Sequence, residues 1–127
     1  MNLKNTFFVV AMLLFAITLS ANAQSKPAKL FKHIVTVTFT ENAPQNEIDE
    51  VDTSFKGLAK LKVVKSYEWG IAPITDRNKE NKHTYAFTFA SLEDLDKYAT
   101  SPEHQKHIKV GVAITKKVEA VQYFVEK

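Results

Sequence analysis

Four histidines are the side chains of this sequence best suited to chemistry near neutral pH: His33, His83, His104 and His107. An imidazole titrates close to neutrality, so it can exchange a proton with a substrate, contact a ligand or bind a metal. We expect His104 in the first turn of a helix, where the positive end of the helix dipole favours the neutral ring. A neutral ring suits a base, a ligand contact or an ordinary hydrogen-bonded side chain, and all three alternatives stay open.

A metal site is the least favoured of these uses. His104 and His107 are three residues apart on one expected helix, a spacing that a pair of metal ligands can have. However, the chain has no cysteine, and no Asp or Glu completes a ligand set at a fixed spacing. We therefore expect neither a metal nor a cofactor, and the alternative for His107 is a solvated surface position.

Alternation of residue types predicts strands that carry the other two histidines. The predicted strands are 33–39, 63–71, 83–89 and 118–125. His33 and His83 each share a strand face with large apolar residues, so we expect both to point into a hollow as polar pocket groups. Trp69 and Tyr85 are further candidates for the ligand pocket, with a place in the core or an interface as the alternative.

Helical spacing predicts an amphipathic helix between the first two strands. The residues at helical spacing are Ile48, Val51, Phe55, Leu58 and Lys62, and the first four form an apolar stripe. The opposite, mostly acidic face includes Asp52. This pattern leaves one stripe to bury and places Asp52 on the polar side of the helix.

Two further helix starts follow the third strand. Ser91 can cap a helix with Asp94 three residues later, and Ser101 with Pro102 starts another helix that we expect to run towards Lys116. Residues 72–82 are predicted to form a polar loop that faces solvent. The resulting order, β-α-β-β-α-α-β, predicts an α+β, ferredoxin-like fold with a four-stranded antiparallel sheet.

The first 23 residues resemble a secretory signal peptide. Lys4 precedes an apolar run over residues 7–19, which is short for a helix that spans the bilayer as a permanent anchor. The small-x-small sequence Ala21-Asn22-Ala23 predicts cleavage after Ala23. We expect a linker over 24–31, one domain over 32–127 and a secreted or periplasmic location, with an uncleaved anchor as the alternative.

Composition limits the partners. The formal net charge of +3 is too weak and too dispersed for nucleic-acid binding, and we expect no membrane contact once the leader is removed. Without cysteine the chain cannot form disulfides, so it relies on packing. A domain of this size has a thin core, and burying a sheet face against a second copy is a common remedy. We therefore expect a homodimer.

Several short motifs together resemble one known family. They are His33-Ile34-Val35, Trp69-Gly70, Phe87-Thr88-Phe89 and Tyr98-x-x-x-Pro102-x-His104. The match runs from about residue 32 to residue 124 and is similar to the stress-responsive A/B barrel (Dabb) domain. The resemblance implies a dimeric α+β barrel, in which two four-stranded sheets pack face to face and the helices cover the outside.

The resemblance also implies roles for individual residues. In olivetolic acid cyclase, a plant relative that closes a ring by aldol condensation, the histidine at the position of His104 acts as the base. Tyr98 then corresponds to its phenolic partner, and a phenol can polarise a carbonyl group. By the same match His33 and His83 line the pocket. Gln122, a further candidate for the pocket, stands where that relative has an Asp that orients the base. Its carbonyl could accept the imidazole N–H, but an amide brings no charge to stabilise an imidazolium.

Two functions follow from these observations. The first is an exported homodimer that binds a small apolar or aromatic ligand in its barrel cavity. The alternative is a cofactor-free cyclase, lyase or isomerase that uses His104 and Tyr98 as an acid–base pair on a carbonyl substrate. A cofactor-free monooxygenase is a weaker variant of the enzyme, and a structural dimer with a collapsed barrel remains a third possibility.

Overall fold

The computed structural model describes residues 29–127, and the elements follow the predicted order. The strands are β1 (Phe31–Phe39), β2 (Val64–Ile71), β3 (Lys82–Phe89) and β4 (Thr115–Phe124). The helices are α2 (Gln45–Leu58), α3 (Leu92–Ala99), α4 (Pro102–His107) and a short 3-10 helix, η1 (Val112–Ile114). The expected leader lies outside the described residues. Within residues 29–127, no helix is long and apolar enough to span a bilayer.

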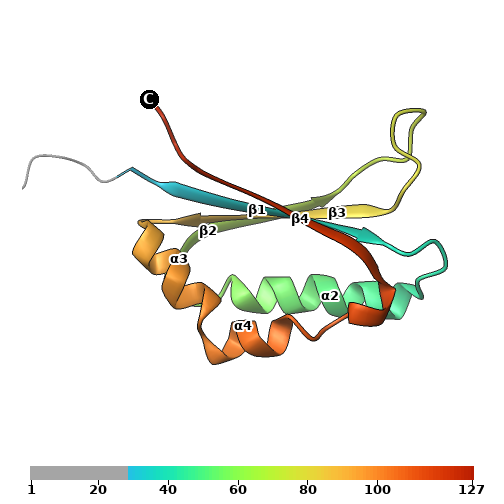
Figure 1. Ribbon diagram of the computed structural model, residues 1–127, viewed down its shortest axis with the longest axis horizontal. Coiled ribbons are helices and arrows are strands. Elements are labelled where there is room, and N and C mark those ends of the chain that lie inside the picture. The colour runs from blue at the N-terminus through green and yellow to red at the C-terminus, as the bar shows by residue number, and fades with distance from the viewer. Residues whose placement is uncertain (1–28) are drawn as a thin grey trace, which may run out of the picture.

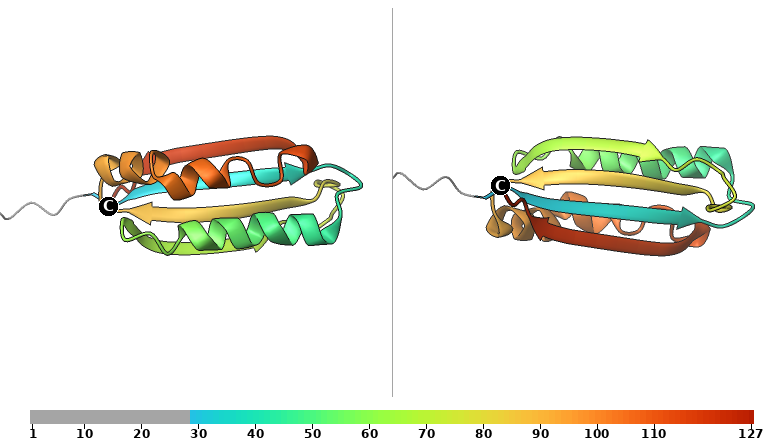
Figure 2. Two further views of the ribbon diagram at one scale, coloured as in Figure 1. Left: turned by 90° about the horizontal axis from the view of Figure 1, so that it is seen from below. Right: turned by 90° about the horizontal axis from the view of Figure 1, so that it is seen from above.

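The four strands form one antiparallel sheet in the order β2-β3-β1-β4. This confirms the ferredoxin-like prediction. The helices all lie on one face of the sheet, and the opposite face is left without helices (Figures 1 and 2). Strand β1 lies between β3 and β4, and its His33 pairs with Phe87 of β3 on one side and with Gln122 of β4 on the other. The sheet therefore has a covered face and an open face.

The core lies between the covered face and the helices. Alternate residues of β1 and β3 supply its floor: Phe31, Val35, Val37, Phe39, Tyr85, Phe87 and Phe89. Phe55 of α2 stacks on Tyr85 with ring centroids 3.7 Å apart, and Tyr98 of α3 packs on Phe87 and Phe89. Both helices thus lie on the aromatic residues of β3.

Two helix ends differ from the sequence prediction. The first helix ends at Leu58 instead of reaching Lys62, because the chain turns there and packs Leu61 and Val63 against the core. The last helix ends at His107 instead of running towards Lys116, because β4 already pairs with β1 from Thr115 onwards. In both places tertiary packing overrides the local helical pattern.

The two predicted serine caps are present. Ser91 Oγ accepts a hydrogen bond from the Asp94 backbone N–H at 3.1 Å, and Ser101 Oγ accepts one from the His104 backbone N–H at 3.2 Å. Pro102 occupies the first turn of α4, where its missing N–H has no cost. These local bonds fix where α4 begins and hence where its histidines lie.

A buried polar contact fixes α2 to the sheet. Asp52 faces β3 rather than solvent, so its predicted place on the polar side of the helix was wrong. Its Oδ1 accepts hydrogen bonds from His83 Nδ1 at 2.7 Å and from the Tyr85 hydroxyl at 2.5 Å. Burial, followed by the bond to Asp52, raises the pKa of the Tyr85 phenol. Because His83 and Tyr85 are almost fully buried, Asp52 is the acceptor that satisfies them.

Substituting Asp52 with alanine should test this contact. Asp52→Ala leaves two buried donors without an acceptor, so we expect the free energy of unfolding to fall by about 3 kcal/mol. Urea denaturation, monitored by circular dichroism, measures this change in the free energy of unfolding. The control is Glu50→Ala on the exposed side of the same helix, with an expected change within about 0.5 kcal/mol. Equal stability of the two variants would contradict the assigned role.

A second test concerns Gly111, which precedes η1 with a φ of 71°. A Cβ placed there would clash with Val51 of α2. Gly111→Ala should therefore lower the free energy of unfolding by at least about 2 kcal/mol. Gly57→Ala is the matched control: Gly57 lies in α2 with open space around it, so alanine should stabilise the protein by about 0.5–1 kcal/mol. Destabilisation by both substitutions alike would contradict this account.

Candidate functional site

A cavity of about 470 Å³ lies between the covered face of the sheet and the helices. Its floor comes from β1 and β4, and its walls come from α2, α3, α4 and the segment that follows α4. The lining residues are His33, Val35, Val37, Val51, Phe55, Tyr98, His104, His107, Ile108, Val110, Val112, Thr115, Val118 and Ala120. No Lys, Arg, Asp or Glu is among them, so the cavity is mainly apolar and its polar groups are mostly imidazoles.

Differences in side-chain size explain why the hollow lies on this half of the sheet. On the covered face, β3 carries Tyr85, Phe87 and Phe89, whose rings fill the space beneath the helices. Apart from His33, β1 and β4 contribute only smaller side chains to the cavity floor, such as Val35 and Ala120. The space beneath the helices is therefore filled over β3 and left open over β1 and β4.

His104 reaches the cavity from the first turn of α4. Its Nδ1 is buried and has no hydrogen-bond partner among the described residues. The ring lies 5.0 Å from the ring of Tyr98, measured between centroids. Burial lowers the pKa of His104, and a backbone hydrogen bond with Ala99 acts in the opposite direction. A buried, unpaired imidazole nitrogen at a cavity wall is a group that a ligand can satisfy.

His107 lies one turn further along α4 and lines the same cavity. Its Nδ1 is 2.7 Å from the Ser54 hydroxyl of α2, and its ring packs edge-on against Phe55 at 4.2 Å. Burial, followed by repulsion from His104, lowers the pKa of His107 to about 4. The solvated position considered for this residue was therefore wrong.

His33 completes the set from β1. Gln122 Nε2, directly opposite on β4, donates a hydrogen bond to His33 Nδ1 at 3.0 Å. Burial, followed by repulsion from His104, lowers the pKa of His33. The amide of Gln122 thus orients His33, whereas the sequence argument considered it as a partner of His104. Gln122 itself is exposed and is not part of the cavity lining.

Three neutral imidazoles therefore share one apolar cavity near neutral pH. No carboxylate among the lining residues stabilises a charged ring, so protonation of any one of them is unfavourable. A neutral imidazole can donate one hydrogen bond and accept another, and it can act as a base. Among residues 29–127, no group of His, Cys, Asp and Glu side chains is arranged to hold a metal ion.

Three other residues expected in the pocket lie elsewhere. Asp52 holds His83 and Tyr85 in the core beneath α2, so neither lines the cavity. Trp69 belongs to the outer strand β2. It stacks on Tyr85, and 45% of its surface is exposed. The sequence pattern groups these residues correctly on one sheet face, but it does not say which part of that face is filled.

The location of the hollow also differs from the expectation. The resemblance suggested that His33 and His83 point into a barrel between two sheets. Both lie instead on the face covered by the helices of the same chain, as their contacts with Tyr98 and Asp52 show. Alternation identifies which residues share a face, but it does not identify what covers that face. The cavity is therefore formed within one chain.

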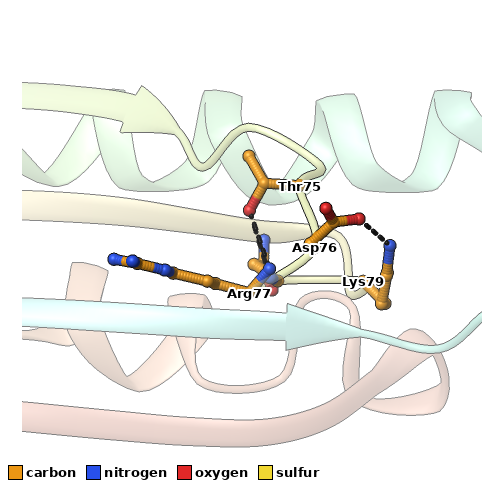
Figure 3. Close-up of polar contacts among 5 residues, drawn as sticks. Thr75, Asp76, Arg77 and Lys79 are labelled. Atoms are coloured by element: carbon orange, nitrogen blue, oxygen red, sulfur yellow. Dashed lines mark hydrogen bonds and ion pairs between the residues drawn. The ribbon is translucent and has the colours of Figure 1, made fainter.

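The polar loop between β2 and β3 lies apart from the cavity. Figure 3 shows its local contacts: the Arg77 backbone N–H donates to Thr75 Oγ1, and Lys79 pairs with Asp76 at 3.2 Å. Thr75 and Asn78 close the turn through their backbones. None of these residues lines the cavity, and we assign the loop no part in it.

Sequence reasoning missed the pairing of Ser54 with His107. The two residues are 53 positions apart, and neither belongs to a motif. The i, i+3 spacing of His104 and His107 was the available signal, and it was considered only for a metal. The same spacing places His104 and His107 on one face of their helix, next to the buried residues of α2. This shared face was the signal that could have indicated a contact with α2.

Several solved structures resemble the chain. Hydroxynitrile lyase from Passiflora edulis is 24% identical with a TM-score of 0.69, over 80% of this chain and 97% of that one. A dimeric protein of unknown function with a ferredoxin-like fold from Bacteroides fragilis is 27% identical with a TM-score of 0.60, over 76% and 96%. SnoaB, a cofactor-independent oxygenase from Streptomyces nogalater, is 11% identical with a TM-score of 0.63, over 79% and 96%.

The first and third of these likenesses are below 25% identity and show the fold alone. No protein of curated function matches the sequence. The family model described as "Stress responsive A/B Barrel Domain" matches residues 31–125, which include every strand and helix that the structure describes. The chain therefore belongs to the stress-responsive A/B barrel (Dabb) domain family.

Proposed function

We propose that the protein binds a small, uncharged and mostly apolar or aromatic molecule in the cavity between its sheet and its helices. The observation that carries this proposal is the buried Nδ1 of His104, which lacks a partner at the wall of an apolar cavity. A buried polar atom without a partner costs free energy. A ligand that hydrogen-bonds to His104 removes that cost and covers the apolar lining.

The lining also indicates which molecules are excluded. No Lys or Arg is available to pair with an anion, and no Asp or Glu with a cation. The lowered pKa values of His33, His104 and His107 keep all three rings neutral at neutral pH. Transferring a charged group from water into such an apolar cavity costs free energy, because the group loses its hydration without gaining a counter-charge. Ligands should therefore be neutral.

Ligand binding should distinguish neutral from charged probes. Titration calorimetry at neutral pH should detect binding of phenol but not of benzoate, because the phenol hydroxyl can donate to His104 Nδ1 and the cavity offers the carboxylate no counter-charge. His104→Phe keeps a ring of similar shape but removes the nitrogen, so phenol affinity should fall about fivefold, the loss of one hydrogen bond. Lys106→Ala, exposed on the same helix, is the control. Preference for benzoate, or equal affinity in the His104 and Lys106 variants, would contradict the proposal.

Acid–base catalysis on a carbonyl compound is the second candidate function. A specific observation favours it: His104 is a half-buried imidazole with a lowered pKa, and the phenol ring of Tyr98 is 5.0 Å away between centroids. In such a reaction His104 would take a proton from the carbon next to the carbonyl group, and Tyr98 would hydrogen-bond to the enolate oxygen. The hydroxynitrile lyase and the cofactor-independent oxygenase with this fold are consistent with enzymatic use of the scaffold.

Exchange of the α-protons of acetophenone for deuterium tests this candidate directly. His104 is active as the neutral base, and its pKa is lowered below 6.5. The exchange rate should therefore already be constant at neutral pH and should fall only in more acidic solution. Substitution by alanine should slow exchange by about 10²–10⁴-fold while the fold is retained. A rate that still rises through pH 7, or an unaffected His104→Ala variant, would argue against His104 as the base.

We also propose that the protein is exported and forms a homodimer through the open face of the sheet. That face carries exposed apolar residues, including Val121 and Tyr123 of β4, which are 60% and 44% exposed. The similar structure from Bacteroides fragilis is described as dimeric. Export rests on the signal-like segment with its cleavage sequence Ala21-Asn22-Ala23.

Mass spectrometry of one sample can test both the cleavage of the leader and the formation of a homodimer. The protein should be expressed as the full chain in a bacterium and isolated from the periplasm or medium. We expect the mass of two chains that each begin at Gln24. Denaturing spectra of the same sample give the mass of one chain. Chains that keep the leader would contradict cleavage, and a monomer at micromolar concentration would contradict the dimer.

A further inference from the structure

We propose that Ser54 and His107 form a second hydrogen-bonding pair in the cavity, which makes the site selective for a ligand with two polar atoms. Ser54 donates to His107 Nδ1, and His107 Nε2–H then serves as a donor to the ligand beside His104. This inference rests on the proposed binding function and deepens it.

The contacts of His107 indicate a fixed ring. Its Nδ1 is held at 2.7 Å by Ser54 of α2, and its ring is held by a T-shaped contact with Phe55 at 4.2 Å between centroids. Both partners come from the same helix, one residue apart. A side chain fixed by packing and by a hydrogen bond presents its remaining polar atom in one direction, as binding sites require.

Counting donors and acceptors assigns the tautomer. The Ser54 hydroxyl proton needs an acceptor, and His107 Nδ1 is the one it contacts within residues 29–127. If His107 carried its proton on Nδ1, that proton would point at the serine oxygen and the serine proton would lose its acceptor. Donation from Ser54 to Nδ1 satisfies both groups. The ring proton then resides on Nε2, which has no partner among the described residues.

The arrangement of the two imidazoles suggests the chemistry of the ligand. The ring centroids of His104 and His107 are 5.8 Å apart, and both rings line the cavity. His104 offers its unpaired Nδ1 and His107 offers its Nε2–H, so two polar atoms on one apolar skeleton can be recognised together. A neutral aromatic compound with a carbonyl oxygen and a hydroxyl group in the meta position is of this class.

Two measurements test the inference. Long-range ¹H–¹⁵N NMR of the unliganded protein at neutral pH reports the tautomer of His107, and we expect protonation on Nε2. Titration calorimetry then compares phenol, whose hydroxyl can donate to His104 Nδ1, with 3′-hydroxyacetophenone, whose added carbonyl oxygen can accept from His107 Nε2–H. Wild-type protein should prefer the two-oxygen probe about fivefold, the contribution of one added hydrogen bond. Ser54→Ala and His107→Phe should abolish the preference, whereas Thr53→Ala, exposed next to Ser54, should keep it.

The outcomes separate this inference from the binding proposal. A proton on Nδ1 of His107, or an unchanged probe preference in Ser54→Ala, overturns the inference even if phenol binds. If no neutral probe binds wild-type protein, the binding proposal and the ligand selectivity fail together, and the NMR measurement still decides the role of Ser54. If His107→Phe does not fold, as judged by circular dichroism, Ser54→Ala alone decides the selectivity.

Discussion

Burial of one face of the sheet under two helices is the constraint on which the rest of the structure depends. The aromatic residues of β3 make the main packing contacts with these helices: Phe55 stacks on Tyr85, and Tyr98 packs on Phe87 and Phe89. Asp52 adds a directional contact, because it fixes α2 to β3 through two buried donors. With α2 and α3 held over β3, the helices span β1 and β4 without filling the space above their smaller side chains. The cavity is a consequence of this uneven packing.

The electrostatics of the cavity follow from the same arrangement. Three histidines reach it from β1 and α4, and no ionised side chain accompanies them. Desolvation is the largest cause of the lowered pKa of each ring. The site thus combines apolar walls with neutral hydrogen-bonding groups. Such a surface suits recognition of a neutral molecule, and it also keeps an imidazole available as a base.

Much of the fold could be predicted because it depends on local signals. Alternation identified the strands and the residues that share a face, and Ser91 and Ser101 marked helix starts through bonds to residues three positions away. The site was harder to predict because it depends on distant contacts. Asp52 reads as a surface residue from helical spacing, yet His83 is its partner 31 positions away. Gln122 and His33 meet only because β4 pairs with β1. Nothing in the alternation of β1 and β3 indicates where the helices leave space.

The central claim is that His33, His104 and His107 are neutral groups in a desolvated cavity. An NMR titration of the imidazole nitrogens from alkaline to acidic solution tests it most directly, since each ring reports its own protonation. All three rings should remain neutral at pH values where an exposed histidine, with a pKa of about 6.5, is half protonated. If the three rings instead gained their protons at or above that value, they would be solvated, and the cavity described here would not exist in solution.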